Sequence, residues 1–126
     1  MYTFTATGHP NIRATHRNTF EFTKDSNLTE NGDCIVAVNA DFEIKKLKQF
    51  LTKEKIKITI TANGMKETIL AAPNPDFSDE HEMVIRITNF ASKRTFAMRA
   101  DKAAMQLDIK VVEQLKKNDK IKITIE

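Results

Sequence analysis

The sequence predicts a mainly β fold with two helices: a single domain, residues 1–126, in which two duplicated β-β-β-α-β halves form a compact closed or partly closed barrel. Three observations support this prediction. The segment Lys-Ile-Lys-Ile-Thr-Ile occurs twice, at 55–60 and at 120–125, and its alternation of apolar and polar residues is typical of a strand. An amphipathic, helix-like segment precedes each copy. The pair Asn63-Gly64, a strong β-hairpin signal, joins the two halves without a flexible linker.

The two halves align residue by residue. A shift of 65 positions superimposes 44–60 on 109–125 and brings the two Lys-Ile-Lys-Ile-Thr-Ile segments into register. Three further pairs of identical residues are separated by 60 or 65 positions: Pro10/Pro75, His16/His81 and Asp41/Asp101. Matches at Pro, His and Asp are improbable by chance. We therefore expect an internal duplication, with repeat 1 at about 1–62 and repeat 2 at about 65–126.

The first half reads as three strands, a helix and a closing strand. The expected elements are strands at 2–7, 19–24 and 34–39, a helix at 42–52 and a strand at 55–61. In the closing strand isoleucines alternate with polar residues, so one face is expected to lie in the core. In the helix, Leu47, Phe50 and Leu51 form one apolar stripe. Asp41 is the expected N-cap, because its carboxylate can accept hydrogen bonds from free backbone N–H groups.

The second half repeats this order. The expected elements are strands at 67–72, 83–88 and 95–100, a helix at 109–117 with Asp108 as its N-cap, and a strand at 120–125. Closure of such strands into a barrel removes exposed sheet edges, with the helices outside the barrel or across its ends. This arrangement resembles the cradle-loop barrels, in which equivalent loops of the two halves approach each other. An open α+β sheet is the alternative.

Charge and composition exclude several classes of protein. The net charge is +3, and the lysines are spread over helix faces and strand exteriors, which indicates a solvated surface more than a stripe that follows phosphates. No apolar run approaches the roughly 18 residues of a membrane span, and no signal-peptide pattern follows Met1. Cys34 is the only cysteine, which excludes an internal disulfide and is typical of a reducing compartment. We therefore expect a cytoplasmic protein without a membrane partner.

The polar loop 8–19, between the first two expected strands, is the first candidate site. It holds two histidines, and imidazole can act as a general acid or base or ligate a metal near neutral pH. The side chains expected to bind a small polar or anionic ligand are His9, Asn11, Thr15, His16 and Thr19. Segment 29–34, with Asp33, and the loop at 73–81 are expected to complete the cleft. The alternative is that each histidine orders a turn through backbone hydrogen bonds.

Five segments carry a resemblance to a known family: Gly-His-Pro-Asn, Ala-Thr-His and Thr within 8–19, Leu28-Thr29 with Gly32-Asp33-Cys34, Val84-Ile85-Arg86, Arg94-Thr95, and 100–104. Over nearly the whole chain they are similar to an archaeal family, domain of unknown function 371. This resemblance implies an archaeal lineage, a cytosolic protein and a site near these segments, but no particular reaction.

An enzyme is the second hypothesis. His16 would act as general base with Asp33 as its orienter, or Cys34 would act as a nucleophile beside a histidine. Because Cys34 opens an apolar strand, the other interpretation is a buried, small apolar side chain. Arg94 and Lys102 would clamp an anion in the functional interpretation, and would be solvated surface cations in the alternative.

The sequence indicates no particular cofactor. His9, His16 and His81 are the histidines available to a metal, but neither Cys-x-x-Cys nor His-x-x-x-His spacing is present, so no metal site is predicted. The third hypothesis is a nucleic-acid-associated protein that uses the lysines within 45–57 and 110–122.

Overall fold

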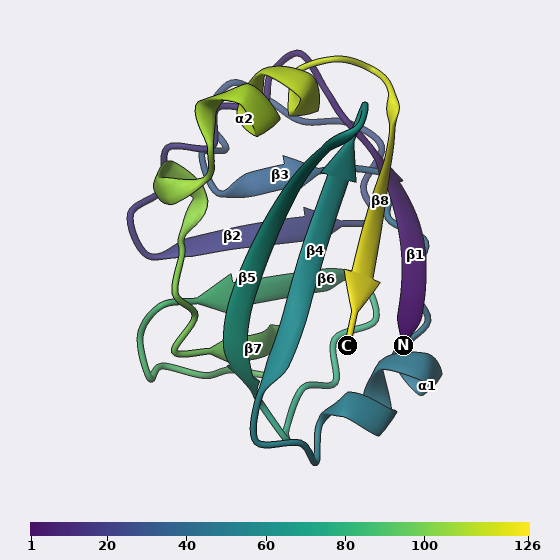
Figure 1. Cartoon of the computed structure of the whole chain (residues 1–126), viewed down its shortest axis with the longest axis vertical. Helices are drawn as coiled ribbons and strands as arrows, with labels where there is room; N and C mark the ends of the chain where they lie inside the picture. Colours follow the sequence, from purple (N-terminus) through teal and green to yellow (C-terminus); the bar gives the residue numbers. More distant parts are fainter.

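Eight strands form one mixed sheet in the computed structural model, which describes all 126 residues (Figure 1). The strands are β1 (Tyr2–Thr7), β2 (Thr19–Thr23), β3 (Ile35–Ala37), β4 (Ile56–Ala62), β5 (Met65–Pro73), β6 (Glu82–Arg86), β7 (Thr95–Met98) and β8 (Lys120–Ile125). Their order in the sheet is β1-β8-β4-β5-β7-β6-β2-β3. The helical elements are α1 (Ile44–Leu47) with the 3-10 turn η1 (Lys48–Phe50), and the 3-10 turn η2 (Ala104–Gln106) before α2 (Ile109–Leu115). The prediction of a mainly β chain with two helices is confirmed.

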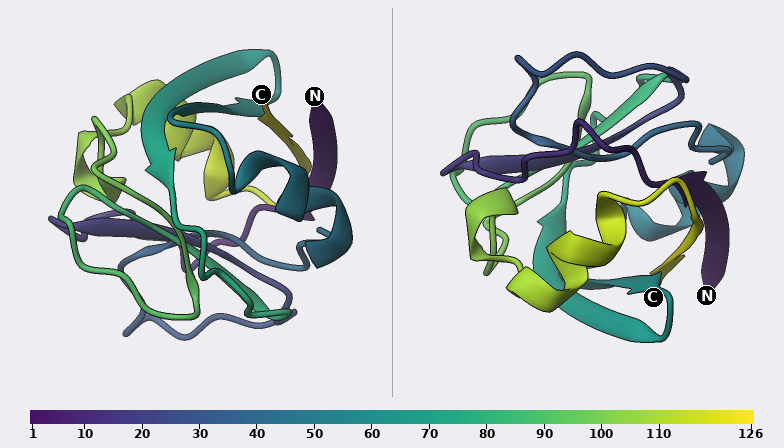
Figure 2. Two further views of the ribbon diagram at one scale, coloured as in Figure 1. Left: turned by 90° about the horizontal axis from the view of Figure 1, so that it is seen from below. Right: turned by 90° about the horizontal axis from the view of Figure 1, so that it is seen from above.

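The sheet folds over on itself around one core. Strands β5, β4, β8 and β1 lie across β2, β3, β6 and β7 (Figure 1). The isoleucines of β4 and β8 and the phenylalanines of β2 belong to one buried core cluster. Helix α1 lies at one end of the molecule and α2 at the other, as the end-on views show (Figure 2). No helix has the length and apolar character to cross a lipid bilayer.

The turn Asn63-Gly64 joins β4 to β5 as predicted. Ala62 faces Met65 across the antiparallel pair, and φ is 49° at Asn63 and 83° at Gly64. Both residues therefore adopt the left-handed conformation that a two-residue hairpin turn requires. The two Lys-Ile-Lys-Ile-Thr-Ile strands, β4 and β8, pair antiparallel with each other.

The expectation of a closed barrel is wrong, because the sheet has two edges, β1 and β3. These edges meet only at an isolated bridge, in which the N–H groups of Thr7 and Val38 donate to each other's carbonyls at 2.7 and 2.8 Å. Strand β3 is three residues long, and the chain turns away from it at Asn39, where φ is 53°. The alternative of an open sheet therefore fits in part.

Two expected strands end early for the same backbone reason. Segments 34–39 and 95–100 form strands only at β3 and β7. Asn39 and Arg99 have φ angles of 53° and 51°, outside the β region, so the ladder cannot continue through them.

Only one of the two expected helix caps forms. The N-cap of α1 is Glu43, which makes no side-chain capping bond. Asp41 instead accepts hydrogen bonds from the N–H and the hydroxyl of Thr5 at 2.7 and 2.9 Å, and so ties the segment before α1 to β1. Asp108 caps α2 as predicted, since its carboxylate accepts the Lys110 N–H at 2.8 Å.

Some backbone hydrogen bonds of the first half have similar bonds in the second half, but at a different separation in sequence from the one that the alignment predicts. The N–H of Ala40 donates to the carbonyl of Thr23, and the N–H of Ala100 donates to the carbonyl of Arg86. Thr23 on β2 and Arg86 on β6 thus accept similar hydrogen bonds although they are 63 positions apart, 86 minus 23, rather than 65. The parallel pairs β2–β3 and β6–β7 also share an irregularity in register.

Candidate functional site

The two histidines of loop 8–19 order turns through their ring nitrogens. His9 Nδ1 accepts the N–H of Asn11 at 3.0 Å. His16 Nδ1 accepts the N–H groups of Asn18 and Thr19, each at 3.1 Å. Because Nδ1 is the acceptor in each case, the proton of a neutral ring lies on Nε2. This geometry matches the turn-forming interpretation of both residues.

The second half forms the same turns with oxygen acceptors. Asn74 Oδ1 accepts the N–H of Asp76 at 3.1 Å, as His9 does for the turn in the first half. Asp79 Oδ1 accepts the N–H groups of His81 and Glu82 at 2.8 and 2.7 Å. In these turn bonds Asp79 takes the place that His16 has in the first half, 63 positions earlier, whereas the sequence alignment pairs His16 with His81.

The remaining polar side chains of this loop are also engaged or turned to solvent. The side-chain amide of Asn11 donates to the Leu28 carbonyl at 2.7 Å and ties the loop to segment 29–34. Thr19 is buried on β2, with its hydroxyl 3.0 Å from His16 Nδ1, and Thr15 is exposed. Of these expected ligand-binding side chains, Asn11 and Thr19 are therefore already engaged within the protein, whereas Thr15 is not.

The expected cleft between loops 8–19 and 73–81 does not form. Strand β1 leads into the first loop at the top of Figure 1, whereas β5 leads into the second loop at the bottom. The cavities beside the first loop are lined by residues of 10–15, Glu30 and 105–116, and the cavity at Pro73–Pro75 is lined by different residues. The sequence pattern could not show that strand direction sends the two loops to opposite ends.

The predicted catalytic side chains of His16, Asp33 and Cys34 are not hydrogen-bonded to one another, and only a backbone hydrogen bond joins His16 to Asp33. The N–H of His16 donates to the Asp33 carbonyl at 3.1 Å, but no hydrogen bond joins the His16 ring to the Asp33 carboxylate or the Cys34 thiol. Burial, together with the charges of Glu21 and Asp33, raises the pKa of Cys34 to about 11. The thiol therefore keeps its proton near neutral pH, which disfavours a nucleophilic role.

The third histidine is paired elsewhere. His81 Nε2 lies 2.6 Å from the Asp25 carboxylate, and both side chains are more than half exposed. No group of three or more His, Cys, Asp or Glu side chains is arranged to hold a metal ion.

The two cations expected to clamp an anion already have carboxylate partners. Arg94 Nη1 lies 3.1 Å from Glu82, and Arg94 Nη2 lies 3.9 Å from Glu21. Lys102 Nζ lies 2.6 Å from Glu67, whose other oxygen accepts the Asp108 N–H at 2.9 Å. Lys102 thus joins β5 to the segment before α2.

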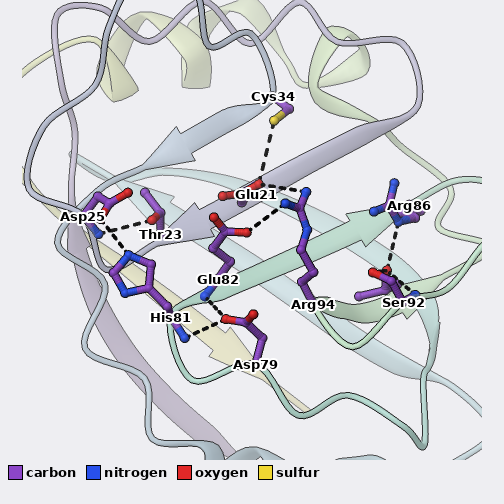
Figure 3. Close-up of polar contacts among 11 residues, drawn as sticks. Glu21, Thr23, Asp25, Cys34, Asp79, His81, Glu82, Arg86, Ser92 and Arg94 are labelled. Atoms are coloured by element: carbon purple, nitrogen blue, oxygen red, sulfur yellow. Dashed lines mark hydrogen bonds and ion pairs between the residues drawn. The ribbon is translucent and has the colours of Figure 1, made fainter.

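A buried acid on β2 is the main electrostatic feature that the sequence did not reveal. Glu21 is only 5% exposed, and it lies beside Arg94, Glu82 and Cys34 (Figure 3). Its carboxylate is 3.9 Å from the thiol of Cys34. Burial, followed by the Glu82 carboxylate, raises the pKa of Glu21 to about 7, while Arg94 lowers it to a smaller extent. Glu21 can therefore gain or lose a proton near neutral pH.

The sequence signal at this position was misleading. Glu21 stands between Phe20 and Phe22, which an alternating strand places in the core, so the acid is expected on a solvated face. All five residues of β2 are buried instead. The second face of β2 is covered by segments that are distant in sequence, and a local pattern cannot show this.

A second feature missed by sequence reasoning is an open groove of about 850 Å³. We call it the cationic groove; its lining residues are Lys53, Glu54, Lys55, Ala72, Pro73, Pro75, Met98 and Arg99. The side chains of Lys53, Lys55 and Arg99 make no ion pair and no hydrogen bond within the protein. An adjoining hollow of about 350 Å³ adds Leu70, Ala71 and Asp101. The lining of the cationic groove comes from three separate segments, near residues 54, 73 and 99, so no local sequence motif marks it.

Comparisons with known proteins identify the family of the chain. A family model described as domain of unknown function DUF371 matches residues 4–126. The chain is also similar to an uncharacterized protein, MJ0206, of the archaeon Methanocaldococcus jannaschii. The two are 33% identical over 123 residues, which cover 92% of this chain and 91% of the relative. The resemblance seen in the sequence is confirmed, and the chain belongs to the DUF371 family.

Proposed function

We propose that the protein is a cytoplasmic binding protein for a small anion with phosphate or carboxylate groups, which lies in the cationic groove. The observation that carries the proposal is the gathering of three cations, Lys53, Lys55 and Arg99, around one open groove. None of the three has a carboxylate partner, and the ammonium of Lys53 lies over the Phe50 ring, 5.3 Å from its centroid. Two carboxylates also border the hollow, but Asp101 Oδ1 already accepts the Leu70 N–H at 3.1 Å. The free donors thus favour a ligand with a phosphate or carboxylate group.

The corresponding place in the first half supports this choice because it is filled. There the N–H of Gly8 donates to the Asp119 carbonyl at 2.9 Å, and the chain packs closely on the end of α2. A Cβ atom on Gly8 would lie 2.0 Å from the Lys117 carbonyl oxygen and 2.5 Å from that of Leu115. At the offset of 65 positions the counterpart of Gly8 is Pro73, which has no N–H and carries a ring. Pro73 cannot dock in the same way, and the groove stays open.

We also propose that the chain is one domain with an internal duplication. The comparison of Gly8 with Pro73 depends on this duplication, because only then do the two residues hold equivalent positions. The support is the recurrence of pairing: β1–β8 matches β5–β4, β2–β3 matches β6–β7, and the bridge between Thr7 and Val38 matches the β5–β7 pair. We assign a structural role to the turns and caps that both halves share. Places where the halves differ, such as the cationic groove, are better candidates for a ligand.

Loop 8–19 is the other location for such a ligand. A cavity of about 290 Å³ there is lined by Pro10, Asn11, Ile12, Arg13, Glu30 and Lys116. The Arg13 guanidinium already donates to the Glu30 carbonyl at 3.1 Å, and the Nδ1 atoms of both histidines are occupied. The cationic groove has more free donors in a larger space, so we favour it.

The test is isothermal titration of the whole chain at low salt with inorganic phosphate, pyrophosphate and citrate. Arg99→Asn is the most informative variant, because its counterpart Asn39 has the same left-handed backbone, and asparagine tolerates φ above zero better than arginine. We expect this variant to fold with unchanged or higher stability and to bind about 10-fold more weakly, as loss of one charge-assisted hydrogen bond implies.

Lys55→Gln should weaken binding to a similar extent. Lys57→Gln is the matched control, because Lys57 lies two residues further along the chain, outside the cationic groove. If none of the three anions binds, or if Lys57→Gln weakens binding as much as Arg99→Asn, the proposed site is refuted.

A further inference from the structure

We infer that the loop between β6 and β7 forms a contact surface for single-stranded nucleic acid, centred on Phe90 and Arg86. This surface is separate from the cationic groove, because the two share no residue. It also differs from the lysine-rich segments 45–57 and 110–122 that the sequence suggested.

Phe90 differs from every other phenylalanine in the chain. Of the eight phenylalanines, Phe90 is 61% exposed, and the other seven are at most 3% exposed. Its ring lies against the guanidinium of Arg86, with Cζ of Arg86 4.8 Å from the ring centroid. The pair thus presents a flat aromatic surface with a positive charge beside it.

The charge of Arg86 is not neutralised within the protein. Arg86 Nε donates to the Thr95 hydroxyl at 2.9 Å, but no carboxylate lies within ion-pair distance of its guanidinium. The nearby Arg94 is already shared between Glu82 and Glu21, as Figure 3 shows. Burial and the charge of Arg94 lower the pKa of Arg86, so a negative group would relieve the crowding of positive charge.

A nucleotide offers both groups that this surface lacks. A base can stack on the exposed ring of Phe90, and its phosphate can reach the neighbouring guanidinium of Arg86. None of the cavities in the structure is lined by these residues. An open surface covers little of a single nucleotide, so we assign it to a strand, which adds contacts along its length.

The uncovered face of β8, β4 and β5 is the rival surface for the same partner. It holds a shallow hollow of about 440 Å³, whose lining includes Lys57, Lys66 and Lys122. This face has threonines between its lysines but no aromatic residue, and Glu126 pairs with Lys57 at 3.6 Å. It could contact phosphates but could not stack with bases.

The experiment is fluorescence anisotropy of a labelled 12-nucleotide oligo(dT) with the whole protein, from 50 to 300 mM salt. We expect Phe90→Ala and Phe90→Leu to weaken binding about 5- to 150-fold, since both remove the stacking surface, while Phe90→Trp retains binding. Arg86→Gln should weaken binding and reduce the slope of log affinity against log salt by about 1.

Two control variants locate the effect. Ile109→Ala removes an exposed apolar side chain elsewhere on the surface, at 72% exposure, and should leave affinity unchanged. Lys57→Gln should also leave it unchanged. Absence of binding at 50 mM salt overturns the inference, as does binding that depends on Lys57 but not on Phe90. Because Phe90 is exposed, its variants should keep the circular dichroism spectrum of the parent.

Discussion

Glu21→Gln isolates the free-energy cost of ionising one buried carboxyl group. Glu21 is 5% exposed on β2, and burial with the neighbouring Glu82 raises its pKa from the ordinary 4.5 to about 7. Glutamine has nearly the same shape but cannot ionise. The Arg94 guanidinium keeps its closer partner, Glu82, at 3.1 Å in this variant. The substitution therefore removes the proton exchange while leaving most of the surrounding contacts in place.

The sign and size of the effect follow from the two pKa values. Between pH 4.5 and about 7 the unfolded chain has an ionised Glu21, whereas the folded chain keeps this proton, so stability falls as pH rises. Above about pH 7 the carboxyl is ionised in both states and the loss is complete. At 1.36 kcal/mol per pH unit, the full loss is about 3 kcal/mol, of which about 2.5 kcal/mol falls between pH 5 and pH 8.5.

Urea unfolding at pH 5, 6, 7 and 8.5 measures this loss. We expect the stability difference between Glu21→Gln and the parent to grow in favour of the variant by about 2.5 kcal/mol across this range. The m-value should stay constant, as required for a change in stability alone. Glu80→Gln removes an exposed carboxylate and serves as the control, with no such trend. A stability difference that is independent of pH would refute the assignment of a buried, protonated Glu21.

Substitutions at three further positions test the scaffold. Gly8→Ala should destabilise the fold by about 2–3 kcal/mol in urea unfolding, because its Cβ would lie 2.0 Å from a backbone oxygen; a neutral result would contradict the close approach. His16→Asn should keep the stability of the parent, and His16→Ala should lose about 1 kcal/mol with the turn bonds; equal effects would argue against the turn role. Lys102→Met should lower the free energy of unfolding by about 2 kcal/mol, because it leaves the 7% exposed Glu67 without its cation. Lys102→Arg should lose less, and thermal unfolding of the two variants measures the difference.

The secondary structure was predictable where a local pattern decides it. Alternating isoleucines placed β4 and β8 correctly, and Asn63-Gly64 gave the hairpin between β4 and β5. Both signals act through neighbouring residues, so no distant contact can reverse them easily. Strand ends at Asn39 and Arg99 were missed because their left-handed conformation depends on bonds to distant segments, and an arginine rarely adopts it.

The candidate site was less predictable, because its residues come from separate segments. The histidines of loop 8–19 were predicted to be reactive side chains, yet their ring nitrogens accept backbone N–H groups within turns. In the second half, the side-chain oxygens of Asn74 and Asp79 accept N–H groups in similar turns. The local pattern around Glu21 did not mark it as a candidate, and its burial is visible only in the fold. The cationic groove unites residues near 54, 73 and 99, which no spacing connects.

By itself, the sequence determined the strands and helices, the hairpin at the midpoint, the matched order of elements in the two halves and membership of the DUF371 family. These features follow from side-chain periodicity and turn chemistry, which act over a few residues. Only the tertiary structure decided that the sheet keeps two edges, that one acid is buried with a pKa of about 7, that Gly8 packs closely on the end of α2, and that Pro73 borders an open groove. Closure, burial and cavity shape depend on contacts between residues far apart in the chain, and these contacts exist only after folding.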